Sequence, residues 1–198
     1  LYRTTNGANW WTAISPDLTD GPGSGNLTYG TITTIAASAS DSQVVYVGTD
    51  DANVWVTQDL GANWQDISAG LPDRWVTRVA VDPRDPGVAY VTHSGYKRDS
   101  YLPHINRTTN YGQTWQDISG NLPQAPVTVV VVDPDLDSTL YVGSDVGVYV
   151  TSNLGQSWSA LGTGLPIPVI HDLVLDRGSR SLVAGTHGRS MFRYELDF

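Results

Sequence analysis

The richest set of chemically active side chains lies in one short stretch, residues 93–104. It carries two of the four histidines, two tyrosines, the only lysine and an adjacent Arg–Asp pair: His93, Tyr96, Lys97, Arg98, Asp99, Tyr101 and His104. Aromatic rings beside hydrogen-bonding groups suit sugars, whose rings present an apolar face and a polar rim. The stretch therefore indicates a loop that binds a glycan or a protein. The alternative, that it packs over a neighbouring part of the fold or pairs with another domain, stays open.

Carboxylates could support hydrolysis of a glycosidic bond, which needs two such groups about 5–9.5 Å apart. The expected fold gathers several aspartates at one end: Asp50, Asp51, Asp73, Asp99, Asp145 and Asp172. Nothing in their spacing singles out a pair, and Glu195 is the only glutamate. The catalytic residues are therefore unassigned, and the question whether the chain is an enzyme stays open.

A few polar residues interrupt the expected strands. Arg74 and Trp75 lead into a strand that contains Arg78, and in the register of the repeats Arg78 aligns with Asp172. We expect Arg78 and Asp172 near the mouth of a central channel, as a buried ion pair that joins two repeats or as a substrate clamp. His171 and Asp172 are neighbours on one strand and point to opposite faces, so they do not form a catalytic triad.

A tryptophan box occurs four times in the chain and fixes the order of the strands that carry these residues. The pattern is Thr-x-Asp/Asn-x-Gly-x-x-Trp, and in the first copy Ala8 replaces the glycine. The hydroxyl and Asx side chains can close a turn, glycine supplies an uncommon backbone angle, and the tryptophan N–H needs a partner. We expect a structural role for Thr57, Asp59, Gly61, Trp64, Thr108, Asn110, Gly112, Trp115, Thr151, Asn153, Gly155 and Trp158. Too few carboxylates converge on the boxes for a calcium loop, and we expect no metal or cofactor.

Between the boxes the sequence repeats a pattern of β-strands. The box tryptophans stand at positions 11, 64, 115 and 158, and each repeat reads as a four-stranded antiparallel meander with the box between strands three and four. This is the signature of an all-β fold, the β-propeller. We expect a single domain, 1–198, with complete blades at 31–68, 75–119 and 126–161 and partial blades at 1–15 and 169–197. We expect a fragment of a larger propeller that self-associates through its exposed terminal blades.

Strand direction assigns the residues to two ends of each blade. The boxes share one end with the turns between strands one and two. The loops between strands two and three, and the crossings to the next blade, lie at the opposite end, where propellers usually bind ligands. Loops on a rigid scaffold are where binding residues concentrate. The candidates at that end are Arg74, Trp75, Arg78, His93, Tyr96, Arg98, Asp99, Tyr101 and His104.

The box resembles the Asp-box, or BNR, repeat of bacterial sialidases. The whole layout resembles the propellers of xyloglucanase-like glycoside hydrolases and sortilin-type propellers, and 185–192 looks like the last blade of large secreted bacterial BNR proteins. The resemblance implies an extracellular or periplasmic propeller segment that binds glycan or protein. If the chain is an enzyme, the resemblance implies a glycoside hydrolase. In that alternative the chain is part of a xyloglucanase-like hydrolase whose carboxylate pair is split between this segment and missing blades. A further alternative is an assembly or scaffold factor. The arginine motif of sialidases is absent, so sialidase activity is not expected.

Composition excludes several classes of function. The formal net charge is −9 with only 11 Lys plus Arg, which disfavours nucleic acid and anionic membrane surfaces as partners. The chain has no cysteine, which excludes disulfides and thiol catalysis. It also lacks a run of about 18 apolar residues, so no membrane span is expected.

Overall fold

The computed structural model describes residues 1–21, 29–165 and 167–196, and within these ranges the chain is built of antiparallel sheets. Three sheets have four strands each. The first contains β3 (Ile32–Ala37), β4 (Val45–Thr49), β5 (Val54–Thr57) and β6 (Gln65–Asp66). The second contains β7 (Trp75–Val81), β8 (Ala89–Ser94), β9 (His104–Thr108) and β10 (Gln116–Asp117). The third contains β11 (Val127–Val132), β12 (Leu140–Ser144), β13 (Gly147–Thr151) and β14 (Ser159–Ala160).

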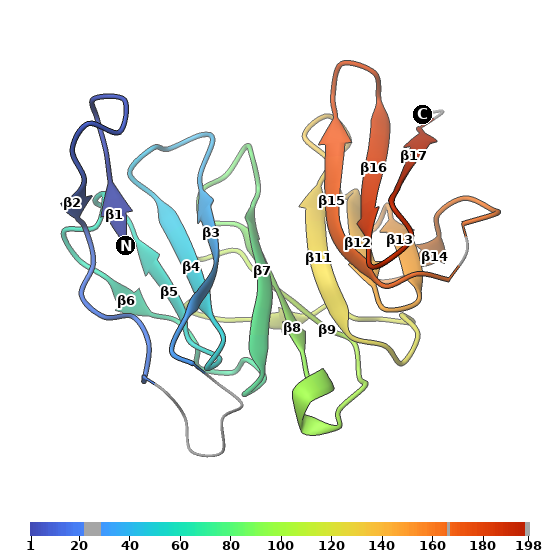
Figure 1. The fold of residues 1–198 in the computed structure, drawn as a ribbon, viewed down its shortest axis with the longest axis horizontal. Coiled ribbons are helices and arrows are strands. Elements are labelled where there is room, and N and C mark those ends of the chain that lie inside the picture. Colours follow the sequence, from blue (N-terminus) through green and yellow to red (C-terminus); the bar gives the residue numbers. More distant parts are fainter. Residues whose placement is uncertain (22–28, 166, 197–198) are drawn as a thin grey trace.

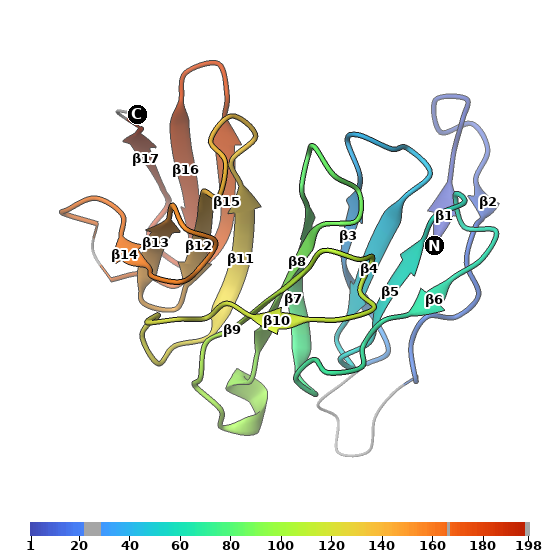
Figure 2. The same ribbon diagram turned by 180° about the vertical axis from the view of Figure 1, so that it is seen from behind.

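Two smaller sheets flank these three. β1 (Tyr2–Arg3) pairs with β2 (Thr12–Ala13) at one side, and β15 (Ile170–Asp176), β16 (Ser181–Thr186) and β17 (Met191–Glu195) form a three-stranded sheet at the other. The five sheets stand side by side in chain order, so the N- and C-terminal sheets lie at opposite ends of the row (Figures 1 and 2). The all-β, bladed architecture expected from the repeats is confirmed. One turn of 3-10 helix, η1 (Tyr96–Arg98), is added within the stretch 93–104.

The core lies between neighbouring sheets, so the central strands are covered on both faces. Every residue of β4 and β12 is buried, which is why these strands read as apolar runs without alternation. Gly48 and Gly143 sit where the next sheet approaches most closely. A Cβ at Gly48 would come within 2.3 Å of a Val76 methyl, and one at Gly143 within 2.5 Å of an Ile170 methyl. A larger residue at either position would push two blades apart.

Threonines on the first strands join each blade to the next. The Thr33 hydroxyl donates to the Val76 carbonyl at 2.6 Å, and the Thr77 hydroxyl donates to the Val127 carbonyl at 2.9 Å. Thr128 makes the same bond to the Ile170 carbonyl. In the last sheet this position is His171, so the series of hydroxyl contacts ends there.

Box tryptophans join each blade to the one before it. The indole N–H of Trp64 donates to the Ile14 carbonyl at 2.7 Å, that of Trp115 to the Ile67 carbonyl at 2.8 Å, and that of Trp158 to the Ile118 carbonyl at 2.9 Å. The sequence pattern left the partner of the tryptophan N–H unassigned; the structure shows a bond between blades. The reason is that strand four of the preceding blade carries a carbonyl that the strand ladder leaves free.

The remaining box residues close the turn that holds the tryptophan. In the second copy the Thr57 hydroxyl accepts from the Gly61 N–H at 2.9 Å, and a carboxylate oxygen of Asp59 accepts from the Asn63 N–H at 2.8 Å. The boxes lie against the turns between strands one and two, because the Leu60 N–H donates to the Gln43 carbonyl at 2.9 Å. The opposite end of the blades, called here the insertion face, carries η1 (Figure 1).

Candidate functional site

A lysine packed on a tryptophan forms the centre of the insertion face. Trp75 begins β7 and pairs in the ladder with Ser94, the last residue of β8. The stretch 93–104 then turns back over it, so the Lys97 ammonium lies 3.9 Å from the centroid of a Trp75 ring and 5.4 Å from that of Tyr29. A cation over an aromatic face is attracted to the ring's negative quadrupole. The contact fixes the loop on the sheet.

The backbone of this loop is closely folded. The Gly95 carbonyl accepts from the N–H groups of Arg98, at 2.8 Å, and Ser100, at 3.1 Å. A Cβ at Gly95 would come within 2.6 Å of the Ser100 Cβ, and Asp99 adopts a left-handed φ of 53°. The tight fold projects the rings of Tyr96 and Tyr101 outward, and they are 64% and 53% exposed. Two apolar rings therefore face solvent beside the Lys97–Trp75 pair.

Polar groups border these rings. The Arg98 guanidinium lies 3.3 Å from a carboxylate oxygen of Asp73 in an exposed ion pair. The Arg74 guanidinium donates to the Asp73 carbonyl at 2.6 Å, and its buried Nε has no hydrogen-bond partner among the described residues. Arg98 and Asp73 could thus form hydrogen bonds at the edge of a ligand that stacks on the tyrosines.

The sequence missed Tyr29, which reaches this surface from the segment before β3. Asp50 holds that segment, since its two carboxylate oxygens accept from the N–H groups of Tyr29, at 2.6 Å, and Thr31, at 2.7 Å. Asp50 is only 2% exposed and is occupied by these bonds, so it does not serve as a free acid. The aspartate at the turn after β4 was the only sequence signal for this contact, but its partner Tyr29 lies 21 residues away in the chain.

The expectation that His93 contacts a ligand is wrong. Its side chain is fully buried opposite His104 in the ladder between β8 and β9, and neither ring nitrogen has a hydrogen-bond partner among the described residues. Burial, with a smaller effect of His104, lowers the pKa of His93 to about 3. Burial also lowers the pKa of the half-buried His104. His93 is thus a neutral core residue at physiological pH.

A second polar group lies on the inner strands. The Arg78 guanidinium on β7 is 2.6 Å from a carboxylate oxygen of Asp172 on β15. These side chains are 35% and 55% exposed, so the ion pair that we expected to be buried is open to solvent. It spans the β11 sheet, because the inner strands β7, β11 and β15 lie side by side (Figure 1).

Histidines and a half-buried carboxyl adjoin the second group. His171 Nε2 lies 3.2 Å from His187 Nδ1, with the rings edge-on at 5.2 Å. Burial raises the pKa of Asp145, and the nearby His171 opposes that shift. A carboxyl that keeps its proton more readily than usual can act as a general acid. Among the described residues no group of three His, Asp or Glu side chains could hold a metal ion.

No helix in the described ranges has the length and apolarity needed to cross a membrane.

Comparisons with known proteins find β-propellers. No family model matches the chain. A xyloglucanase from Paenibacillus sp. is 29% identical over 150 residues, which is 68% of this chain but only 14% of that protein. The GH74 xyloglucanase structure from Xanthomonas campestris superposes with a TM-score of 0.69 and 18% identity, covering 98% of this chain and 32% of that one.

A further solved structure, of YCF48 bound to D1 peptide, superposes with a TM-score of 0.63 and 20% identity over 85% of this chain and 52% of that one. The chain therefore has a β-propeller fold that resembles xyloglucanase-like hydrolases. It spans about one seventh of the Paenibacillus relative and about one third of the Xanthomonas structure.

Proposed function

We propose that the chain is the propeller segment of a secreted, xyloglucanase-like protein and that it binds a glycan on the insertion face. The observation that carries the proposal is the platform of Lys97 on Trp75 beside the exposed rings of Tyr96 and Tyr101. The likeness to xyloglucanases supports a carbohydrate over a protein as ligand.

The chemistry of the platform favours a neutral glycan. Sugar C–H faces stack on aromatic rings, and their hydroxyl rims accept from Arg98 and donate to Asp73, which stand at the platform's edge. The net charge of −9 repels acidic sugars at a distance. Lys97 supplies a further hydrogen-bond donor above Trp75. A neutral hydroxyl can accept from it, so the ligand needs no negative group.

Titration calorimetry with neutral xyloglucan oligosaccharides tests this site. We expect Tyr96→Ala and Trp75→Ala each to weaken binding by about tenfold or more, the effect of about 1.4 kcal/mol. Tyr2→Ala is the matched control, because Tyr2 is 65% exposed but lies in the N-terminal sheet. Unchanged affinity in both platform variants would remove the site from the insertion face.

A second candidate function is glycoside hydrolysis. Asp145, whose pKa is raised by burial, would serve as the general acid, and Asp172, which pairs with Arg78, as the second carboxylate. Release of reducing ends from xyloglucan, lost in Asp145→Asn with ligand affinity retained, would support this reading. Absence of hydrolysis together with tight binding would leave a binding module. A third candidate is an assembly or scaffold factor. It would bind peptides and not oligosaccharides when tested with the same variants, Tyr96→Ala and Trp75→Ala.

A further inference from the structure

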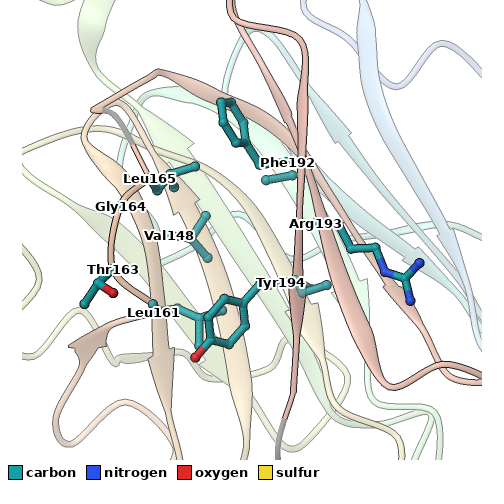
Figure 3. A pocket seen from close by; sticks show the side chains of 11 residues that line it. Val148, Leu161, Thr163, Gly164, Leu165, Phe192, Arg193 and Tyr194 are labelled. Atoms are coloured by element: carbon teal, nitrogen blue, oxygen red, sulfur yellow. The ribbon is translucent and has the colours of Figure 1, made fainter.

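A cavity of about 160 Å³ opens between the last two sheets, beside β17. It is bordered by Val148, Leu161 and Leu165 from one sheet and by Leu182, Ala184 and Phe192 from the other. Figure 3 shows Val148, Leu161, Leu165 and Phe192 gathered on one side, while the Arg193 side chain points away from them. A cavity of about 150 Å³ with such walls accommodates a benzene-sized ring.

The same six positions one blade earlier enclose a tryptophan. Trp158 is 4% exposed and belongs to one core cluster with Ile105, Ile118 and Leu122 of the preceding blade and Leu140 and Val142 of its own. Tyr149 packs against that cluster. The ladder positions of these residues correspond in order to Val148, Leu161, Leu165, Leu182, Ala184 and Phe192. The cavity is thus the tryptophan socket of the next interface.

The hydrogen-bond acceptor of that socket is also free. The carbonyls of Ile14, Ile67 and Ile118 each accept from a box tryptophan. Leu161 is their counterpart, since its N–H bonds the Val148 carbonyl as the Ile118 N–H bonds the Ile105 carbonyl. No donor within the described ranges reaches the Leu161 carbonyl.

The strand beside the socket does not lead into a box. The third strands β5, β9 and β13 end in Thr57, Thr108 and Thr151, whose hydroxyls close the box turn. At the matching ladder position β17 has Tyr194, which pairs with Leu182 as Thr151 pairs with Leu140. A tyrosine ring cannot take the place of that hydroxyl in the turn. Residues 194–198 therefore do not form a tryptophan box.

The N-terminal box carries a tryptophan that is not buried in the described structure. Trp11 is 58% exposed and its indole N–H has no partner among the described residues. Its box is already folded, because the Ala8 N–H donates to the Thr4 hydroxyl at 3.0 Å and the Trp10 N–H to Asn6 Oδ1 at 3.0 Å. The two ends lie at opposite sides of the molecule, so this box cannot fill the socket of its own chain (Figures 1 and 2).

We propose that the socket beside β17 binds the N-terminal tryptophan box of a second copy of this chain, with Trp11 in the cavity and its indole N–H on the Leu161 carbonyl. Docking brings β2 of the second copy to the free edge of β17. There β17 takes the place of β1 as the ladder partner of β2, since β1 and β2 share only two residue pairs. The contact joins unlike surfaces, so it propagates head to tail and gives rings or chains of molecules. It is separate from the glycan platform.

Ala8 sets the strength of this contact. Its counterpart Gly155 faces the Ile118 carbonyl, and a Cβ there would lie 2.5 Å from that oxygen. The Ala8 methyl must therefore push the docked box outward, and we expect weak association that strengthens in Ala8→Gly.

Sedimentation velocity over a range of concentrations tests the proposal on the 198-residue chain. Wild type should form head-to-tail oligomers, and Trp11→Ala should weaken them about 30-fold, the effect of losing a tryptophan hot spot. Trp10→Ala, at a residue 77% exposed, is the matched control and should not change them. A wild-type chain that stays monomeric, or oligomers that persist in Trp11→Ala, would overturn the assignment.

Mixing two variants distinguishes a lost interface from misfolding. Trp11→Ala keeps the socket, and Leu165→Glu, at a half-buried wall residue, keeps the box. Each should be monomeric alone, whereas an equimolar mixture should form dimers and nothing larger, because only one donor and one socket remain functional. Failure of the mixture to dimerise, with both variants folded by circular dichroism, would contradict the proposal.

Discussion

Asparagine and aspartate fill the same position in different boxes, and the residue four positions later accounts for the choice. Asp59 accepts from the Asn63 amide at 2.7 Å. Asn110 and Asn153 instead donate their own amide to the hydroxyls of Thr114 and Ser157, each at 2.9 Å. The oxygen that closes the turn is common to all three. The two residue types are therefore equivalent as turn acceptors and differ in their second contact.

This pairing predicts an asymmetry between two conservative substitutions. Asn110→Asp should be tolerated, because the Thr114 hydroxyl can donate to a carboxylate as readily as it accepts from an amide. Asp59→Asn should lower the midpoint temperature of unfolding more, since a neutral amide would replace the carboxylate that accepts both bonds from Asn63. Differential scanning calorimetry of both variants measures this; an equal shift in the two would contradict the pairing.

His93 predicts a loss of stability in acid. Its folded pKa of about 3 lies below the ordinary value of 6.5, so the unfolded chain binds the proton first. The free energy of unfolding should be level above pH 6.5 and fall between pH 6.5 and 3, with a slope that approaches about 1.4 kcal/mol per pH unit.

Chemical unfolding at a series of pH values measures that slope. His93→Leu should flatten the curve and cost little, because it removes two buried nitrogens that have no partner. His104→Gln removes the neighbouring half-buried imidazole, whose pKa is also lowered by burial, and so shows how much of the slope comes from His104. A curve of the same slope in His93→Leu would show that another group titrates.

At the scale of single elements, the box tryptophan links blades by packing and by one hydrogen bond. Trp158→Ala should cost about 3–5 kcal/mol, as large-to-small core substitutions do. Trp158→Phe keeps a ring but loses the bond to the Ile118 carbonyl, and should cost at least the ~1 kcal/mol of that bond. Urea unfolding measures both. Trp10→Ala is the exposed control and should stay within about 0.5 kcal/mol of wild type.

The elements were predictable because their signals are local. β-branched runs gave strands such as Ile32–Ala37 and Val127–Val132, and the spacing of the boxes gave their order. The contacts of the tryptophan and of His93 were not predictable, since both depend on which neighbour a side chain faces across a blade boundary. Tyr29 and Trp75 converge on Lys97 from positions 68 and 22 residues away (97 − 29 and 97 − 75), a proximity that only the tertiary fold creates.

At the scale of the whole molecule, stability should decrease from the centre of the row of sheets to its ends. β12 is buried throughout, whereas both residues of β1 and of β2 are exposed and share two ladder pairs. Apart from the Arg78–Asp172 ion pair, the sheets pack on their neighbours along the chain, so the end sheets lose support on one side.

Hydrogen exchange read by mass spectrometry tests that gradient. We expect amides of β1 and β2 to exchange first, β17 next, and β8 and β12 last. The comparison is made with the Trp11→Ala variant, in which head-to-tail contacts cannot protect the ends. Uniform protection along the chain would contradict the gradient and indicate one cooperative unit.

Each boundary between complete blades is joined twice, in opposite directions. A first-strand threonine donates forward to the next blade, and a box tryptophan donates backward to the previous one. Every repeat unit therefore carries one donor and one acceptor of each kind. A gene that duplicates or deletes a whole repeat keeps all boundaries matched, so copy number can change during evolution without any compensating substitution.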